Sequence, residues 1–543
     1  MTPSRQRPQL IDRINARRSR LPEPNAWNKH EVRIPLRDGV RLAADLYAPA
    51  APSKGVILVR TPYGRGTIMS LQFARVWAGQ GYTVLYVASR GTDGSEGTFD
   101  PMRTETEDGH DVIDWLRGRP FYPGSFATFG HSYLGYAQWA ILEDPPEDLV
   151  AAVVMEGPHD FARHAWDSGS FHGDQLGWAA MVETIHSHSV KDLAQAIKLN
   201  RSPERVLRST PVIDEADKTF ADASPWLHER LVRSDLDDPY VASMRHARAL
   251  EVSTVPTLII AGWQDIFLPQ SIEQYQALAA RGVETRLIAG AWTHTDMDNT
   301  VVRPAVLDWL DSHLKPTQQA AATGSAPAQV PDHGVDVELT PTGTWRHLTT
   351  WPPEGSTTAL YPGPDHQLTS AMPVNHDISF VFDPADPTPS IGGNELSKGG
   401  YREDTSVAKR DDVLHFDTPP LENELTIMGS PKVQLNHRTD LPDADVFVRV
   451  SDVDESGRST NVTDAYVRVV GEHDCVQLDM HHTAHVFAAG HRIRLLVAGG
   501  WFPYYSRNSG TGENPLTAAT FRPNRHRITF GPGTVLELPT VEN

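Results

Sequence analysis

Two hydrophobic patterns divide the chain, and each predicts a different arrangement of strands. Up to residue 157, and again over residues 251–315, short apolar runs alternate with segments of helical periodicity. Uninterrupted apolar strands that alternate with helices are typical of a parallel sheet covered on both faces. The runs in this series are residues 55–59, 82–87, 126–129, 151–155, 255–260 and 285–289. We therefore predict one doubly wound α/β domain built from residues 1–157 and 251–315.

Residues 158–250, between the two parts of that domain, have helical patterns rich in Trp and His and contain no strand run. A helical insertion between strands of one sheet is typical of a cap, so we predict a cap here.

At the start of the domain, apolar and polar residues alternate on both sides of Asp38-Gly39. Because this dipeptide suits a tight turn, the pattern predicts a β-hairpin.

The second pattern follows a change in composition. Residues 316–334 are mostly Ala, Gln, Pro, Thr and Gly, which predicts a linker. Over residues 335–543 the apolar runs are short and Pro and Gly recur at brief intervals. Such punctuation is typical of a β-sandwich, so we predict a C-terminal all-β domain of the jelly-roll kind.

Charge and cysteine content narrow the range of partners and compartments. The 543 residues include 69 acidic side chains and 49 Lys or Arg, a formal net charge of −20. A field of this sign repels phosphate backbones and anionic lipids, so we expect no nucleic-acid and no membrane partner. The single cysteine, Cys475, excludes an intrachain disulfide. With no apolar stretch suited to a membrane helix or a signal peptide, the sequence predicts a cytoplasmic protein.

The sharpest chemical motif is the glycine-flanked serine within residues 130–135, Gly-His-Ser-Tyr-Leu-Gly. It follows the apolar run at residues 126–129 and precedes a helical pattern, the context of a nucleophile elbow. The second glycine stands one position later than in the usual five-residue motif. An ordinary strand-to-helix turn would also explain the motif taken alone.

Two further residues favour a hydrolase over that plain turn. Asp265 follows the strand at residues 255–260, and His294 follows the strand at residues 285–289. A serine nucleophile needs a base and an acid that orients the base, and Ser132, Asp265, His294 is the chain order of α/β-hydrolases. All three are placed beyond the carboxyl ends of strands, where open α/β sheets bind ligands. We predict this triad, and we expect neighbouring His131 to pack structurally around the turn.

Other polar clusters favour structural roles. The glycine-rich loop at residues 90–97 lacks the Lys-Ser/Thr of a phosphate-binding loop. His481, His482 and His485 lie in a strand-and-turn pattern without an acidic partner of the zincin kind. The acidic residues at 452–455 lack the final acid of a calcium loop. We therefore expect neither a cofactor nor a metal ion.

Taken together, the motifs resemble the cocaine esterase and X-prolyl dipeptidyl-peptidase family of serine hydrolases, which includes α-amino-acid ester hydrolases. The resemblance covers almost the whole chain and rests on residues 60–63 (Arg-Thr-Pro-Tyr), 89–97, 130–135, 262–265, 290–294, 383–387 and 483–492. It implies an α/β-hydrolase domain with a helical cap and a C-terminal jelly roll.

The resemblance also implies roles for further residues. The phenol of Tyr63 and the backbone N–H of Tyr133 would form the oxyanion hole. Phe267, Trp178 and Trp166 would line the substrate pocket. In this sequence the cap spacing around Trp166 is shorter than in the cocaine-esterase pattern.

The expected activity is hydrolysis of a small-molecule carboxylic ester or amide through an acyl-enzyme on Ser132. An X-Pro dipeptidyl-peptidase or an α-amino-acid ester hydrolase or acylase is an alternative, which would need carboxylates to hold a substrate ammonium. Candidates are Glu156, Asp160, Asp167 and Asp174, to which the sequence assigns no role. A non-catalytic binding protein on a hydrolase scaffold and an acyl transferase are further alternatives. The natural substrate and any homo-oligomer stay open.

Overall fold

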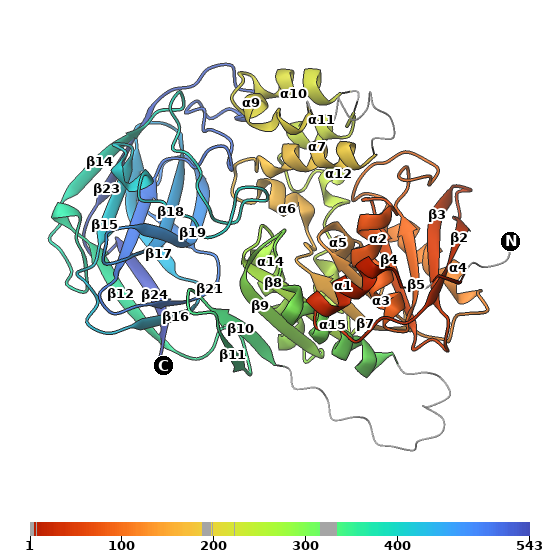
Figure 1. Cartoon of the computed structure of the whole chain (residues 1–543). Coiled ribbons are helices and arrows are strands. Elements are labelled where there is room, and N and C mark those ends of the chain that lie inside the picture. The colour runs from red at the N-terminus through yellow and green to blue at the C-terminus, as the bar shows by residue number, and fades with distance from the viewer. Residues whose placement is uncertain are drawn as a thin grey trace.

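An α/β domain and an all-β domain lie side by side in the computed structural model of the chain (Figure 1). The structure describes residues 5–6, 8–186, 197, 199–221, 223–314 and 334–542. Nearly all of the linker expected at residues 316–334 therefore lies outside the described residues. Within the described part of the chain, no helix is both long and apolar enough to cross a membrane.

The α/β domain is organised around a sheet of 11 strands. From β4 to β10 the neighbouring strands run parallel, while β1, β2, β3 and β11 add antiparallel pairs at the two edges. In sheet order the strands are β1 (Arg5–Gln6), β2 (Trp27–Pro35), β3 (Arg41–Pro49), β5 (Thr83–Ala88), β4 (Val56–Thr61), β6 (Phe126–His131), β7 (Leu149–Met155), β8 (Thr257–Gln264), β9 (Thr285–Thr293), β10 (Val335–Leu339) and β11 (Thr344–Leu348). The doubly wound sheet expected from the apolar runs is confirmed. The predicted start of the C-terminal domain at residue 335 is wrong, because β10 pairs with β9 and β11 pairs with β10, so both strands extend the α/β sheet.

Both faces of this sheet are buried, as uninterrupted apolar strands require. Along β4, Ile57 and Val59 belong to one hydrophobic core, and Val56 and Leu58 belong to the core on the opposite face. Helices on one face are α2 (Thr67–Phe73), α3 (Arg75–Gly79) and α15 (Asn299–His313), and those on the other are α4 (Glu105–Arg117) and α14 (Leu268–Ala280). Helix α5 (Tyr133–Leu142) contributes to both cores, and α1 (Leu10–Arg18) contributes Ala16 to the first.

The chain between β7 and β8 is helical, without a named strand among its described residues. Its helices are α6 (Phe161–Trp166), α7 (Asp174–His186), α9 (Pro203–Leu207), α10 (Val212–Phe220), α11 (Leu227–Val232), α12 (Pro239–Ala242) and α13 (Arg248–Val252). In Figure 1, α7 and α9 to α12 lie together at the top, over the region where the two domains meet. This position suits a cap over the carboxyl ends of the parallel strands.

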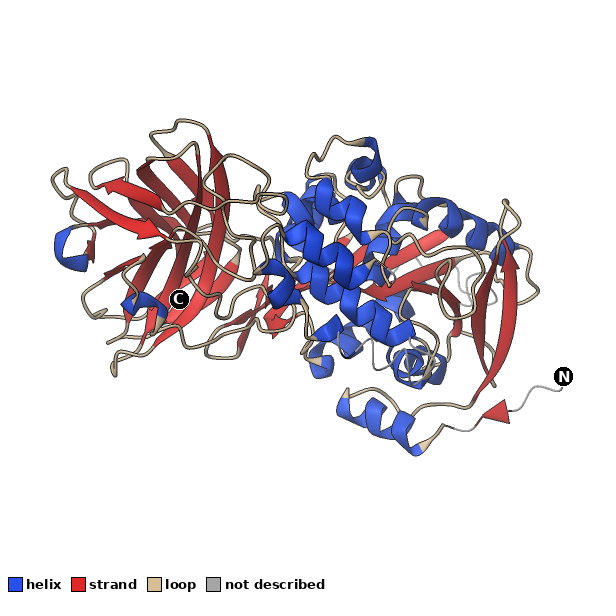
Figure 2. Cartoon of the chain, turned by 90° about the horizontal axis from the view of Figure 1, so that it is seen from above, coloured by secondary structure: helices blue, strands red, loops and turns tan. Residues whose placement is uncertain are grey.

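The C-terminal domain packs two antiparallel sheets around a core of its own, and the expected all-β class is confirmed (Figure 2). The larger sheet contains β12 (Ser356–Pro362), β13 (Leu368–Thr369), β14 (Asp377–Phe382), β16 (Leu425–Gly429), β17 (Lys432–Thr439), β20 (Val476–Asp479), β21 (Thr483–Phe487), β23 (Asn524–Thr529) and β24 (Val535–Val541). The smaller sheet contains β15 (Val413–Asp417), β22 (Arg492–Ala498), β18 (Asp443–Val453) and β19 (Ser459–Val470). Apolar residues of β17 and β18 meet between the sheets.

Candidate active site

Ser132 lies at a sharp turn between β6 and α5. Its φ of 59° is positive, which is uncommon for a residue with a side chain and marks a strained turn. Close packing explains the flanking glycines. A Cβ on Gly130 would lie 2.4 Å from Leu134 atoms, and a Cβ on Gly135 would lie 2.7 Å from the Cα of Gly157. The backbone N–H of Ser132 donates to the Met155 carbonyl at 2.9 Å, which ties the turn to β7.

The structure brings Ser132, His294 and Asp265 into one chain of hydrogen bonds. The Nε2 atom of His294 lies 2.8 Å from the Ser132 Oγ. Its Nδ1 atom lies 2.9 Å from the Asp265 Oδ1. Asp265 is fully buried, and its other oxygen accepts the Phe267 N–H at 2.8 Å, which fixes the orientation of the carboxylate. This geometry can move a proton from the hydroxyl to the imidazole.

Tyr63 follows β4 and directs its phenol toward the same serine. The Trp178 indole donates to the Tyr63 hydroxyl oxygen at 3.1 Å. Burial raises the pKa of Tyr63, while hydrogen bonding with Trp178, Ser132 and the backbone of Tyr133 acts in the opposite direction. The phenol therefore stays neutral near neutral pH and can donate a hydrogen bond.

The Tyr133 amide meets the phenol at the start of a helix. Tyr133 is the first residue of α5, and the first N–H groups of a helix have no intrahelical acceptor. The helix dipole also favours negative charge at this end. The phenol of Tyr63 and the N–H of Tyr133 thus converge beside Ser132, as expected for a pair of oxyanion donors.

A cavity of about 330 Å³ opens onto Ser132 and His294. Its walls come from the carboxyl ends of the strands, from α2 and α15, and from α7 of the cap. Most of the lining is apolar or aromatic: Met69, Phe73, Trp77, Phe129, Met155, Phe161, Trp178, Met181, Ile185, Ile266, Phe267, Met297, Val302 and Val306. Such a lining suits a large apolar substituent of a substrate.

Of the three aromatic residues that the resemblance assigns to the substrate pocket, two line the cavity and one does not. Phe267 and Trp178 line the cavity. Trp166 is not among its lining residues. The indole of Trp166 donates instead to the Arg230 carbonyl at 3.2 Å, and its ring packs against Phe171 inside the cap.

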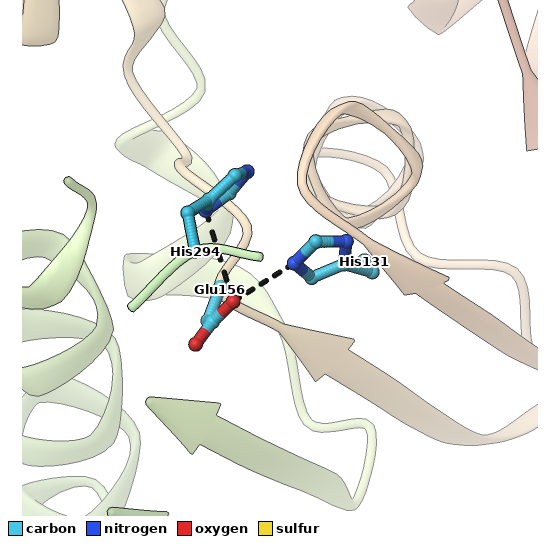
Figure 3. A group of neighbouring side chains, drawn as sticks. All are labelled: His131, Glu156 and His294. Atoms are coloured by element: carbon cyan, nitrogen blue, oxygen red, sulfur yellow. Dashed lines mark hydrogen bonds and ion pairs between the residues drawn. The ribbon is translucent and has the colours of Figure 1, made fainter. Parts of the chain in front are cut away.

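His131 and Glu156 form a second polar pair directly beside His294 (Figure 3). Glu156 Oε2 lies 2.8 Å from His131 Nε2 and 3.7 Å from His294 Nδ1. The rings of His131 and His294 are 4.6 Å apart at an angle of 32°. Packing alone was expected for His131, and the contact with Glu156 was missed. The signal that could have found it is the position of Glu156 directly after an apolar run.

Burial decides the protonation of this pair. Desolvation, reinforced by the nearby His294, lowers the pKa of His131 well below its ordinary value. Desolvation and the charges of Asp265 and Asp296 raise the pKa of Glu156 well above its ordinary value. Near neutral pH the imidazole of His131 is therefore neutral, and burial favours the protonated form of Glu156.

His131, Glu156 and His294 also offer three donor atoms within 4.8 Å of one another, a set that suits a transition metal. The Nδ1 of His294 already bonds to Asp265, however. A metal on this nitrogen would leave the ring proton on Nε2, where it blocks proton transfer from Ser132. A metal bound at this position would thus oppose the hydroxyl-to-imidazole transfer that the rest of the site favours.

The other acids considered for an ammonium site have separate positions. Asp160 accepts from Arg245 Nε at 2.8 Å, and Asp167 lies 3.3 Å from an Arg163 nitrogen. Asp174 lines the cavity, where its Oδ2 accepts the Leu396 N–H at 3.1 Å. Burial and the neighbouring Glu395 raise the pKa of Asp174 well above its ordinary value, which disfavours its charged form.

Two protein-family models match the chain, one over the α/β domain and the other over the C-terminal domain. Residues 38–296 match the family described as X-Pro dipeptidyl-peptidase (S15 family). Residues 329–536 match the X-Pro dipeptidyl-peptidase C-terminal non-catalytic domain. Cocaine esterase from Rhodococcus sp. (strain MB1 Bresler) is 29% identical over 544 residues, which cover 89% of this chain and 92% of that protein.

Solved structures share the whole architecture. An aminopeptidase from the marine sediment archaeon Thaumarchaeota archaeon superposes with a TM-score of 0.80 at 22% identity, covering 95% of this chain and 97% of that one. An α-amino acid ester hydrolase superposes with a TM-score of 0.79, also at 22% identity and the same two coverages. At this identity the likeness establishes the fold and leaves the substrate open.

Proposed function

Because the chain combines the two domains of the X-Pro dipeptidyl-peptidase (S15) family, we propose that it hydrolyses a small-molecule carboxylic ester or amide. The observation that carries the proposal is the hydrogen-bonded chain from Ser132 through His294 to Asp265, with spacings of 2.8 and 2.9 Å. It ends at a cavity large enough for a substrate.

The first half of the reaction forms an acyl-enzyme. Ser132 Oγ attacks the substrate carbonyl while its proton moves to His294 Nε2. Asp265 keeps the ring proton on Nδ1 and stabilises the imidazolium. The carbonyl oxygen becomes negative and accepts hydrogen bonds from the Tyr63 phenol and the Tyr133 amide. When the intermediate collapses, His294 returns its proton to the leaving alcohol or amine.

The second half releases the acid. Water enters the site of the departed group and gives a proton to His294 Nε2 as it attacks the acyl carbonyl. The same two donors stabilise the second oxyanion. Collapse breaks the bond to Ser132 Oγ, which recovers its proton from the imidazolium. The residues of this chain thus supply nucleophile, base and oxyanion donors for both steps.

The cavity lining favours an ester with a bulky apolar acyl or alcohol group over a peptide. An X-Pro peptidase or amino-ester hydrolase must hold a substrate ammonium, and a charged carboxylate would do so best. Asp174 is the one carboxylate among the described residues that line the cavity, and burial raises its pKa, which disfavours the charged form that an ammonium group needs. An aryl ester is therefore expected to be hydrolysed faster than the matching α-amino ester or X-Pro amide.

The test compares the wild type with Ser132→Ala. We expect the wild type to react with a fluorophosphonate probe and to hydrolyse a nitrophenyl ester with a burst. The variant should be folded by circular dichroism, yet give no label, no burst and no turnover. A variant that retains full activity contradicts the mechanism. A wild type that neither labels nor turns over favours a non-catalytic scaffold, and transfer to an added alcohol favours an acyl transferase.

A further inference from the structure

Two carboxyl groups, from two different strands, approach the same nitrogen of His294. Asp265 follows β8 and lies 2.9 Å from Nδ1. Glu156 follows β7, the next strand in the sheet, and its Oε2 lies 3.7 Å from Nδ1. Both side chains extend from the carboxyl ends of neighbouring parallel strands, so they reach the imidazole from adjacent positions.

The backbone holds Glu156 firmly in this position. Its φ of 45° is positive, a conformation that costs free energy for a residue with a side chain. Its N–H donates to the Ile260 carbonyl at 2.8 Å, which attaches it to β8. The side chain is fully buried. The strained backbone aims the carboxyl group toward the imidazole.

The partners of Glu156 also point toward the site. Among the described residues, its titratable neighbours within 4 Å that could pair with it are His131 at 2.8 Å and His294 at 3.7 Å, and it forms no ion pair with a Lys or Arg. Burying a carboxyl group without a cation is costly. A structural acid would be expected to pair with an arginine, as buried Glu105 does with Arg60. Glu156 instead contacts the two imidazoles at the serine.

We propose that Glu156 is a second positioning residue for His294, which supports the imidazole through His131 and accepts the hydrogen bond from Nδ1–H when Asp265 is removed. The inference rests on the proposed function, since it concerns the same proton transfer. Closing the gap to hydrogen-bond length requires a movement of roughly 1 Å. Loss of the Asp265 side chain would provide the necessary space.

Removing Asp265 would also favour the ionised form of Glu156, which is the form that accepts a hydrogen bond from Nδ1–H. The charged groups that face Glu156 are Asp265 after β8, Asp296 after β9 and the imidazoles of His131 and His294, with the Trp292 indole beside them. The charge of Asp265 raises the pKa of Glu156. Without it the pKa falls, so Glu156 ionises at a lower pH and becomes a better acceptor for Nδ1–H.

The experiment measures nitrophenyl-ester kcat and the fluorophosphonate labelling rate of Ser132 in a double-mutant cycle. Loss of a triad acid typically costs about 10⁴-fold. We expect Asp265→Ala to lose only about 10²-fold, and Asp265→Ala/Glu156→Gln to reach the full loss of about 10⁴-fold. In the Asp265→Ala background the ionisation of Glu156 should add a step to the pH profile of kcat, beyond the rise that the base His294 gives in every variant, and this added step should be absent from the double variant.

Glu395→Gln is the matched control, because Glu395 is buried with a raised pKa but does not contact His294. It should change kcat by the same small factor in both backgrounds. If Asp265→Ala does not fold, Asp265→Ser replaces it, since a hydroxyl can still accept the Phe267 N–H. Folding is checked by thermal denaturation.

Two results would overturn the inference. One is Glu156→Gln lowering kcat by the same factor with and without Asp265. The other is Asp265→Ala alone showing the full loss, with the same pH profile as the double variant. In both cases a wild type that labels leaves the proposed function intact. A wild type that does not label contradicts the proposed function and this inference together.

Discussion

At the residue scale, the phenol of Tyr63 has two different hydrogen-bonding roles. Its oxygen accepts from the Trp178 indole at 3.1 Å, so the aromatic wall of the cavity also orients the phenol. Its O–H remains available for an oxygen that becomes negative at the serine. A donor aimed at a developing charge acts mainly in the transition state.

Tyr63→Phe should therefore lower kcat far more than it changes KM. Loss of one oxyanion donor typically reduces kcat by about 10² to 10³-fold. Steady-state kinetics with a nitrophenyl ester measures both parameters. Tyr275→Phe serves as the control, since this buried tyrosine on α14 does not line the cavity. An unchanged kcat in Tyr63→Phe would remove the phenol from the mechanism.

At the element scale, the site depends on how closely α5 approaches the chain after β7. Gly135 on α5 and Gly157 after β7 face each other, so that a Cβ on the first would lie 2.7 Å from the Cα of the second. Because the contact is with backbone, a neighbouring side chain cannot rotate away to relieve it. This contact sets the position of the helix that carries the Tyr133 amide.

Gly135→Ala should accordingly separate α5 from β7. Overpacking of this kind costs about 1 to 3 kcal/mol, so we expect a lower Tm. Fluorophosphonate labelling of Ser132 should also be slower, because the serine precedes the displaced helix. Calorimetry and labelling kinetics measure the two effects.

Gly177→Ala is the control for that substitution, because Gly177 lies on helix α7 and a Cβ there meets nothing within 4 Å. Alanine favours a helix over glycine by about 1 kcal/mol, so its Tm should stay the same or rise. If Gly135→Ala behaves like Gly177→Ala, the close contact does not position the site.

At the scale of the whole molecule, the C-terminal domain holds the segment that carries the acid. Asn394 donates its side-chain amide to the Asp265 carbonyl at 2.6 Å. Gln264, the preceding residue, exchanges hydrogen bonds with Val462 and Asn461 of β19, both at 3.0 Å. The all-β domain therefore holds the backbone around Asp265, although Ser132, Asp265 and His294 all belong to the α/β domain.

Asn394→Ala should weaken the reaction without touching the substrate. A buried carbonyl that loses its donor costs about 1 to 3 kcal/mol, and 1.4 kcal/mol at the transition state is about tenfold in rate. We expect kcat to fall on the order of tenfold with the fold retained. Asn436→Ala on β17, a strand that pairs only within the C-terminal domain, should leave kcat unchanged. Equal changes of kcat in the two variants would contradict the proposal that Asn394 supports the backbone at Asp265.

The sequence alone predicts the apolar runs that become strands β4 to β9, the two sheet classes, and the placement of Ser132, Asp265 and His294 after three of the strands. These features depend on local patterns, because burial of a strand on both faces requires continuous apolar residues and a sharp turn requires small neighbours. Residues next to such turns can therefore be identified without coordinates. The family resemblance adds Tyr63, whose approach to Ser132 no local pattern indicates.

Only the tertiary structure decides which distant segments meet around the carboxyl ends of the parallel strands. It places Glu156 beside His294, Asn394 against the Asp265 carbonyl, and Trp178 on the Tyr63 phenol, while it places Trp166 inside the cap. Each contact joins elements far apart in the chain, and its geometry depends on helix packing and domain docking. Hydrophobic periodicity specifies which face of an element is buried, but not which side chain of another element it will contact.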